Sequence, residues 1–533
     1  MTGGNTNLTS QTLSESEAAV TGTASDKTFQ QNMVTTAKGG SISFAGRIFE
    51  YVVRFVFSIL VARVVGAEQY GLYTLALTIS PIASMLALLG LQTGVVAYLA
   101  PAIRARNDSR IWGIIQVCAG IPAFLSIIFG ATLFFFAVPV ATLVFHEPRL
   151  IPLLQIVSVS IPLDTISFIA YQIIISYQKP KFSVLANNMV LPAAKLLLTI
   201  LFLALGMGVM GIVLAHVIAS AIGLALIIYF VNSLFALNRP LAQAERNVGK
   251  LLRYSLPVHL GWVLNTIRGS LETLVLGFVG LTTGVGIFAV ASRLSSLGTM
   301  LFLSIGNIST PMIADFFSQG DTKQLNQLYQ TTTKWVVMFN VPLFLTFVLF
   351  SGPLLSIFGA DFKNGATALI VLSIGNLVYT GTGLGANILD MTNHTKFNSI
   401  NSVFMVIVTI SSDLLLIPRL GVIGAAIASS FSTVIVNVVC LIEVYVLLKM
   451  QPYGRDIFKP VLAGAITAAL VLGFNQFQVL PSFYHVLVGI MILWSVYILI
   501  MIRLGLSQDD RLILAKLRSR LKLMIPFRRP LAE

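Results

Sequence analysis

The stretch SISFAGRIFEYVVRFVFSILVARVVGAEQYGLY, residues 41–73, decides how the rest of the chain is interpreted. Its apolar part is long enough to cross a bilayer as one helix, since about 20 apolar residues span the hydrocarbon core. Arg47, Glu50 and Arg54 stand at positions i, i+3 and i+7, so a helix places them on one face. Ionisable groups at membrane depth usually face a bundle interior or a wet cavity. The stretch therefore predicts a transmembrane helix with a functional charged face.

The composition of the whole chain indicates a membrane protein. Of its 533 residues, 56% are hydrophobic and only 10% are charged, with a mean hydropathy of +0.88. Soluble domains carry about 25% charged residues. The formal net charge of +14 comes from basic residues in short loops and a tail, where they orient the protein and contact anionic lipid. We therefore expect an all-α polytopic protein whose basic residues meet membrane lipids and not nucleic acid.

Counting about 20 apolar residues for each crossing predicts about fourteen transmembrane helices. They cover residues 42–66, 71–99, 113–140, 150–177, 183–206, 209–236, 254–279, 285–313, 330–357, 366–391, 398–418, 421–448, 458–478 and 482–503. Fifteen Lys and Arg residues lie in the loops after even-numbered spans, against four after odd-numbered spans. By the positive-inside rule, both termini face the cytoplasm.

These spans divide the chain into six segments. The sequence predicts a disordered cytoplasmic N-terminal tail, a six-helix lobe, a cytoplasmic linker, a second six-helix lobe, two further helices and a basic cytoplasmic tail, at residues 1–40, 41–237, 238–253, 254–448, 449–503 and 504–533. The first segment is polar and contains no apolar core of a signal peptide.

The two lobes repeat each other. The motif Val65-Gly66 followed by Gly71-Leu72-Tyr73 is echoed by Val279-Gly280 followed by Gly286-Ile287-Phe288, at an offset of 214 to 215 residues. In the same way GVMGIVLA, residues 208–215, matches GVIGAAIA, residues 421–428, at an offset of 213. Because each unit has an even number of spans, the repeats are parallel, as in transporters that rock two halves around a central site.

The repeat relates two arginines. Arg54 stands twelve residues before Gly66, and Arg268 stands twelve residues before Gly280. We therefore expect Arg54 and Arg268 at the same depth in the two lobes. Arg47 and Glu50 have no charged counterpart, so we expect them nearer the cytoplasmic entrance.

The VxGxxxYGxY turn at residues 64–73, with the six-plus-six repeat and two extra spans, resembles oligosaccharide flippases of the polysaccharide transporter (Wzx-type) family. That family belongs to the multidrug/oligosaccharidyl-lipid/polysaccharide flippase superfamily. The resemblance covers about residues 42–503. It implies flipping of a polyprenyl-diphosphate-linked oligosaccharide from the cytoplasmic to the outer leaflet of a prokaryotic inner or plasma membrane. It also implies alternating access and cooperation with glycan assembly proteins.

A lipid-linked diphosphate requires cationic groups that replace its water, and arginine does so with a bidentate fork. The candidate substrate-binding residues are Arg47, Arg54, Arg268, Arg293 and Lys195. Three alternatives remain open at this point. Glu50 stands three residues after Arg47 and four before Arg54, so an internal ion pair is the alternative to ligand binding in the first span. Arg268 stands four residues before Glu272 and would equally well form an internal ion pair, and Lys195 would equally well be a partner of Asp164.

The intramembrane carboxylates suggest coupling to an ion gradient. Glu50, Asp164, Glu272 and Asp413 are candidates to bind H⁺ or Na⁺, because a desolvated carboxylate tends to take up a proton or a cation. The alternative is that they pair with neighbouring helices. We expect no catalytic residue, metal site or cofactor.

Two rival functions fit the sequence less well than flipping. An ion-coupled drug or metabolite antiporter of the same superfamily needs acids to dominate the cavity, whereas the first span leads with two arginines. A membrane-embedded glycan polymerase or ligase needs catalytic groups in a substantial outer loop. The longest predicted outer connection is only about nine residues long, near Gly359 to Gly365.

Overall fold

The computed structural model describes residues 8–237, 240, 245–246, 248–476 and 482–505, and the elements within them are helices. Ten of the described helices are long and apolar enough to cross a membrane, or up to eleven when a bent pair counts as one span. The expectation of an all-α polytopic membrane protein is confirmed, while the count of fourteen stays a prediction. The predicted basic tail lies almost wholly outside the described residues.

The chain forms two compact units. The N-terminal unit comprises Met1–Phe57, Ala83–Phe135 and Leu154–Trp262, and the C-terminal unit comprises Ser58–Ile82, Phe136–Leu153 and Val263–Glu533. The division cuts across the two predicted lobes: segments 58–82 and 136–153 of the first lobe pack with the second, and 254–262 of the second packs with the first.

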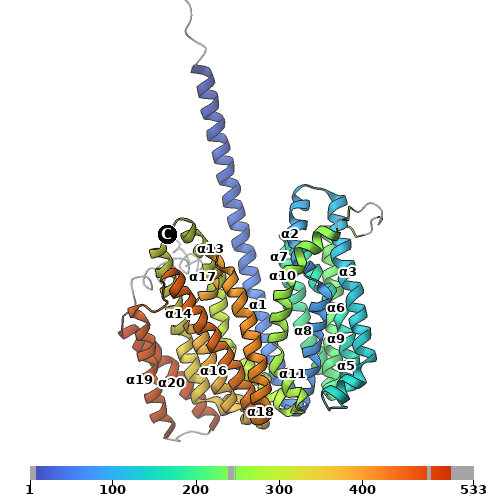
Figure 1. Ribbon diagram of the computed structural model, residues 1–533, viewed down its shortest axis with the longest axis vertical. Helices are drawn as coiled ribbons and strands as arrows, with labels where there is room; N and C mark the ends of the chain where they lie inside the picture. Colours follow the sequence, from blue (N-terminus) through green and yellow to red (C-terminus); the bar gives the residue numbers. More distant parts are fainter. Residues whose placement is uncertain (1–7, 238–239, 241–244, 247, 477–481, 506–533) are drawn as a thin grey trace, which may run out of the picture. The chain divides into compact units, whose positions relative to one another are not determined.

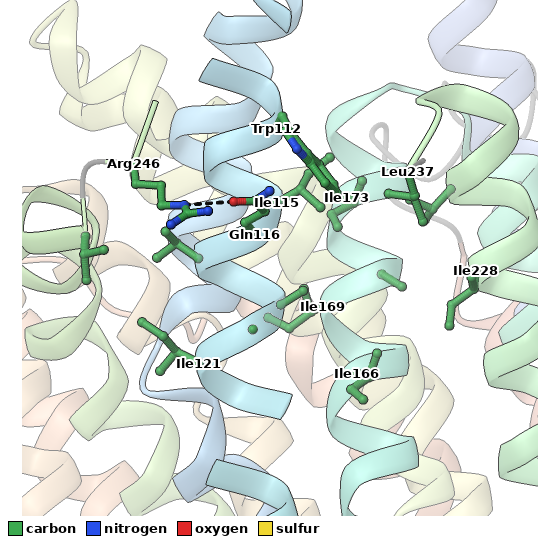
Figure 2. Close-up of a pocket in the computed structure, with 16 residues that line it drawn as sticks. Trp112, Ile115, Gln116, Ile121, Ile166, Ile169, Ile173, Ile228, Leu237 and Arg246 are labelled. Atoms are coloured by element: carbon green, nitrogen blue, oxygen red, sulfur yellow. Dashed lines mark hydrogen bonds between the residues drawn. The ribbon is translucent and has the colours of Figure 1, made fainter. Parts of the chain in front are cut away.

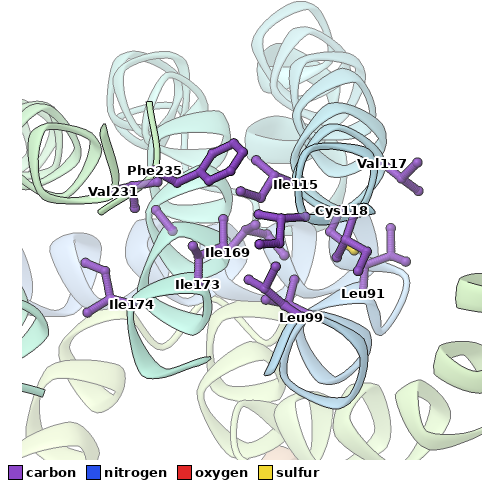
Figure 3. Close-up of a cluster of buried hydrophobic side chains, with 14 of the residues drawn as sticks. Leu91, Leu99, Ile115, Val117, Cys118, Ile169, Ile173, Ile174, Val231 and Phe235 are labelled. Atoms are coloured by element: carbon purple, nitrogen blue, oxygen red, sulfur yellow. The ribbon is translucent and has the colours of Figure 1, made fainter. Parts of the chain in front are cut away.

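The N-terminal unit contains all or part of ten described helices that lie between α1 and α10 in the chain (Figure 1). These are α1 (Leu8–Leu88), α2 (Leu91–Arg104), α3 (Asp108–Phe135), α5 (Leu150–Ser158), α6 (Ser160–Ser176), α7 (Pro180–Ser183), the π-helix η2 (Val184–Val190), α8 (Leu191–Ala204), α9 (Gly208–Leu234) and α10 (Val248–Arg268). Helix α6 packs against α2, α3 and α9, and α8 against α9. Apolar side chains that gather between α2, α3, α6 and α9, such as Leu99, Cys118 and Ile173, form its core (Figure 3).

The C-terminal unit contains the remaining helices, together with residues 58–82 of α1. These are α4 (Ala137–Pro139), the π-helix η1 (Val140–Val144), α11 (Leu271–Phe278), α12 (Thr282–Ser295), α13 (Leu297–Ser318), α14 (Thr322–Leu349), α15 (Ser351–Ser356), the 3-10 helix η4 (Ala360–Gly365), α16 (Ala366–Gly381), α17 (Gly385–Met391), α18 (Thr395–Leu448), the 3-10 helix η5 (Arg455–Ile457), α19 (Phe458–Gln476) and α20 (Ser482–Arg503). Within this unit α16 packs against α14 and α18, and α19 packs against α14 and α20 (Figure 1).

The backbone carries the sequence repeat. Gly66 and Gly280, related by the repeat, have φ angles of 77° and 78°. Gly208 and Gly421, related in the second match, have φ angles of 54° and 56°. Such angles are strained for residues with a Cβ, so both pairs require glycine. Gly66 and Gly421 also break the long helices α1 and α18 into two parts each. The repeated glycines therefore mark turns between spans in both halves.

A second repeated pair makes a close helix crossing inside the C-terminal unit. A Cβ added to Gly71 would lie 1.8 Å from the carbonyl oxygen of Thr282, and one added to Gly286 would lie 2.1 Å from that of Ala67. Ala67 and Thr282 have the same offset as Gly71 and Gly286. The contact is thus reciprocal between the repeats, and only glycine permits it. We call it the Gly71–Gly286 crossing; the predicted orientation places it on the outer side.

The N-terminal unit contains its own crossing between the two halves of the sequence. A Cβ added to Gly90, before α2, would lie 2.3 Å from the carbonyl oxygen of Ser255 in α10. One added to Gly94 would lie 2.6 Å from Ser255 Oγ. We call this the Gly90–Ser255 crossing; the predicted orientation places it towards the cytoplasm.

Two boundaries differ from the sequence expectation. Helix α10 begins at Val248, inside the predicted linker 238–253, and is followed by a separate helix, α11, after a break at Gly269 and Ser270. Helix α1 begins at Leu8, within the segment for which composition predicts disorder. Composition measures hydrophobic content and not the backbone's local preference, so it does not set helix ends.

Candidate functional site

One cavity of the N-terminal unit is apolar. It has a volume of about 640 Å³ and lies in the N-terminal unit between α3, α6 and α9 (Figure 2). Isoleucines dominate its lining, and Gln116 accepts a hydrogen bond of 2.9 Å from Nε of Arg246 at its edge. A surface of this kind suits hydrocarbon. A diphosphate or a sugar would leave its polar groups without partners here.

A smaller cavity of about 380 Å³ brings together the charged face predicted from the first span. Arg47, Glu50 and Arg54 line it beside Asn188. Arg54 pairs with Glu50 at 2.7 Å, yet the Arg54 side chain is 63% exposed. Asn188 donates a hydrogen bond to the other Glu50 oxygen. Within the described part of the chain Arg47 forms no ion pair, so Glu50 leaves one of the two arginines unneutralised. We call this cavity the arginine pocket.

The position of Asn188 has a local cause. It lies in η2, where the backbone adopts a π-helical register, a feature that is frequent at functional sites. Pro192 stands four residues later and has no N–H to donate to the Asn188 carbonyl, so the ordinary α-helical bond cannot form there. The proline thus accounts for the change of register beside Glu50.

Lys195 and Asp164 are connected through a third residue. Lys195 Nζ donates a 3.1 Å hydrogen bond to Nδ1 of His216, and His216 Nε2 lies 3.7 Å from Asp164 Oδ2. The Lys195 ammonium also stands 5.0 Å from the ring centroid of Phe57. The histidine therefore links α6, α8 and α9 in a row of charged and polar groups.

Arg268 lies in different surroundings. It lines a cavity of about 450 Å³ in the C-terminal unit, and its guanidinium donates a 3.1 Å hydrogen bond to Asn265 Oδ1. No ion pair joins Arg268 to Glu272 among the described residues. The rest of the lining is mostly serine and asparagine side chains from α12, α16 and α18. We call this cavity the amide cavity.

The two candidate ion-coupling carboxylates of the C-terminal unit, Asp413 and Glu272, are buried. Asp413 has no exposed surface, and neither of its oxygens has a hydrogen-bond partner among the described residues. Glu272 is 8% exposed.

Arg293 belongs to the Gly71–Gly286 crossing. Its guanidinium donates a 3.3 Å hydrogen bond to the hydroxyl of Tyr70, and that hydroxyl lies 2.8 Å from Ser58 Oγ. Tyr70 is buried and packs edge-on against Phe362. Tyr70, the first tyrosine of the turn motif, thus stabilises the Gly71–Gly286 crossing through these contacts.

Sequence reasoning missed the roles of Asn188 and the amide cavity; for His216 it expected a bridge between helices, and the structure has one. One signal was available for the cavity: Ser429, Thr433 and Asn437 recur every four residues in an apolar run, which places them on one helix face. No such signal existed for Asn188, whose partner Glu50 lies 138 residues away.

Comparisons with known proteins agree with this architecture. The family model described as "Polysaccharide biosynthesis protein" matches residues 36–317, and the MatE model matches residues 257–415. The chain is 29% identical over 254 residues to "Probable flippase AglR" of Haloferax volcanii, covering 40% of this chain and 52% of that protein. It is 20% identical over 265 residues to "Probable low-salt glycan biosynthesis flippase Agl15" of the same organism, covering 49% and 55%. The chain spans about half the length of these curated relatives.

Solved structures share the fold. The lipid II flippase MurJ in an inward closed conformation superposes with a TM-score of 0.71 at 18% identity, covering 87% of this chain and 98% of MurJ. An inward-facing multidrug resistance MATE family transporter of the MOP superfamily gives 0.65 at 16% identity, covering 76% and 98%. Because the first family model covers more than half of the 533 residues, the chain belongs to the polysaccharide biosynthesis protein family.

Proposed function

We propose that the protein flips a lipid-diphosphate-linked oligosaccharide from the cytoplasmic to the outer leaflet of a prokaryotic cell membrane, with both termini in the cytoplasm. Its membership of the family and its similarity to relatives named as flippases support this proposal. The flipped glycan is then available to glycan assembly proteins on the outer side.

The observation that carries the proposal is the arginine pocket. A diphosphate carries its charge where the lipid joins the sugar, and it binds guanidinium groups bidentately. Arg47 has no ion-pair partner among the described residues, and Arg54 remains largely exposed beside Glu50. We assign the diphosphate to these two arginines, with Arg268 as the counterpart in the C-terminal unit.

Alternating access is supported by the two glycine crossings. Each joins helices from both halves of the sequence, one within each unit. At these contacts the backbones meet at glycine, and little side-chain material lies between them to repack. The two helices are therefore either in contact or apart. We propose that the Gly71–Gly286 crossing opens to release cargo outside and that the Gly90–Ser255 crossing opens to admit it from the cytoplasm.

We further propose that Asp413 and Glu272 couple transport to a gradient of H⁺ or Na⁺. The support is that Asp413 is fully buried without a hydrogen-bond partner among the described residues. Glu50 and Asp164 are weaker candidates because Arg54 and His216, respectively, lie against them.

A drug or metabolite antiporter is the second candidate, favoured by the match of residues 257–415 to the MatE model. An organic cation needs carboxylates along its cavity. The amide cavity is lined by one arginine and no carboxylate. The flippase proposal therefore accounts better for this cavity.

The test is transport by the purified protein in lipid vesicles. Lipid-linked oligosaccharide extracted from the source membranes is placed in one leaflet, and its appearance in the other is followed by oxidation with membrane-impermeant periodate. We expect Arg54→Ala to abolish transport, because the diphosphate loses a guanidinium, and Arg54→Lys to restore it only partly, since lysine lacks the fork.

The matched control is Arg419→Ala, which removes an exposed arginine outside the arginine pocket and should transport like the wild type. Normal transport by Arg54→Ala would refute the assignment of the diphosphate. Failure of the wild type to move any lipid-linked oligosaccharide, with full transport of an organic cation, would favour the antiporter.

A further inference from the structure

The amide cavity has an unusual lining for a membrane-embedded unit. Thirteen of its eighteen lining residues have polar side chains: Arg268, Ser292, Ser295, Ser296, Asn376, Tyr379, Asn398, Asn401, Ser402, Ser429, Ser430, Thr433 and Asn437. Polar groups inside a membrane are unfavourable unless they bind one another, water or a ligand. Their convergence on one cavity of about 450 Å³, within the range of about 300–1,000 Å³ for small-molecule sites, points to a ligand.

Several of the amides are held in place by groups behind them. Asn398 donates a 2.9 Å hydrogen bond to Asp390, and Asn401 donates one to Glu443. Asn376 donates a 2.6 Å hydrogen bond to Ser295 Oγ. An amide has two N–H groups and a carbonyl oxygen, so each keeps capacity for a ligand after this one bond. The two carboxylates orient the amides without lining the cavity themselves.

The charge of the lining selects among ligands. Arg268 is the single ionised group that lines the amide cavity. A diphosphate alone would call for several cations. Hydroxyl and amide groups match instead a ligand that presents many neutral donors and acceptors, and Tyr379, packed edge-on against Phe302, adds one aromatic ring. Sugars have this chemistry.

We propose that the amide cavity binds the neutral sugar residues of the cargo, hexoses and N-acetylhexosamines, with Arg268 at the phosphate that adjoins the first sugar. This inference rests on the proposed function. It assigns recognition of the glycan to the amide cavity of the C-terminal unit.

The experiment measures binding of a glycan without its lipid. Mild acid releases the oligosaccharide from lipid-linked material extracted from the source membranes, and the neutral product is titrated into the detergent-purified full chain. We expect Asn437→Leu to weaken binding about tenfold or more, because it removes an amide and fills the cavity, and Asn376→Ala to weaken it about threefold. Both variants should bind inorganic pyrophosphate like the wild type.

The matched control is Asn387→Ala. Asn387 is an amide of the same unit that donates to Thr310 and does not line the cavity, so its variant should bind the glycan within twofold of the wild type. Asn376→Ala keeps the test decisive if the larger substitution prevents folding.

Each outcome decides the proposal. Wild-type glycan binding by both cavity variants, or an equal loss in Asn387→Ala, would overturn it. Absence of wild-type glycan binding while lipid-linked cargo is still transported would also overturn it and would leave the proposed function standing. Glycan binding that depends on Asn437, without any transport of the lipid-linked form, would retain the site and refute the flippase.

Discussion

Arg54 and Arg268 occupy equivalent places in the sequence repeat, yet they lie in opposite chemical surroundings. Arg54 stands in a charged pocket, paired with Glu50 at 2.7 Å. Arg268 lines a cavity of neutral amides and hydroxyls, bonds to Asn265 and forms no ion pair among the described residues. The repeat has preserved the arginine and changed what surrounds it.

The same contrast extends to the carboxylates. In the N-terminal unit Glu50 and Asp164 each have a basic group within 4 Å. In the C-terminal unit Asp413 is buried without a hydrogen-bond partner among the described residues. The two units thus differ in whether their candidate coupling acids have a basic partner, and this difference underlies the proposals of a charged ligand for one unit and a coupling ion for the other.

The largest expected effect concerns the coupling ion. Asp413→Asn should abolish the response of transport to a proton or sodium gradient, because the amide cannot exchange a proton or neutralise a cation. Transport in vesicles with an imposed gradient should then fall to the rate measured without one.

The matched variant in the other unit is Asp164→Asn, which should keep the gradient response, since Asp164 lies against His216. A response that disappears in Asp164→Asn and persists in Asp413→Asn would reverse the comparison. Indifference of the wild type to both gradients would remove coupling from the proposal.

A smaller effect separates the two arginines themselves. Glu50→Gln should raise the affinity for inorganic pyrophosphate about 1.5- to 5-fold, because it releases Arg54 from a partly exposed ion pair worth about 0.2–1 kcal/mol. Glu272→Gln should change it less than twofold, since Arg268 is not ion-paired to Glu272. Isothermal titration calorimetry in detergent measures both.

The double variant Arg47→Ala, Arg54→Ala removes both guanidinium groups of the arginine pocket. The pyrophosphate binding that it loses relative to the wild type is the binding at that pocket. If Glu272→Gln raised pyrophosphate affinity as much as Glu50→Gln, the difference between the two arginines would not hold.

The smallest expected effect lies outside the membrane spans. Arg149 donates a 2.8 Å hydrogen bond to Glu147, which lowers the pKa of that carboxyl, and another of 2.6 Å to Glu68. A lowered folded-state pKa gives stability that is present above the unfolded pKa of about 4.3 and is lost as the pH falls through the folded pKa. Glu147→Gln should therefore lower the free energy of unfolding of the protein by about 0.2–1 kcal/mol at pH 7.

Thermal unfolding in detergent between pH 7 and pH 3 measures this effect, and the difference from the wild type should narrow below pH 5. Asp361→Asn is the control, because this exposed carboxylate forms no ion pair among the described residues. A difference that widened on acidification would contradict the stated sign.

Local sequence patterns predicted the features that depend on neighbours along one helix. The face of Arg47, Glu50 and Arg54 follows from helical periodicity, and the Arg54–Glu50 pair follows from an i, i+4 spacing. The sequence left two roles open for Lys195, namely contact with the substrate or an ion pair with Asp164. It did not predict that His216 would stand between Lys195 and Asp164, because that depends on how α6, α8 and α9 pack.

By itself, the sequence determined the membrane environment, the helical class and the repeat. These follow from hydropathy and periodicity, which act within a short stretch or recur at a fixed offset. Only the tertiary structure decided that Asn188 holds Glu50, that Tyr70 holds Arg293 and that the asparagines of α16 and α18 share one cavity. Those contacts depend on helix rotation and on which helices become neighbours, and packing sets both.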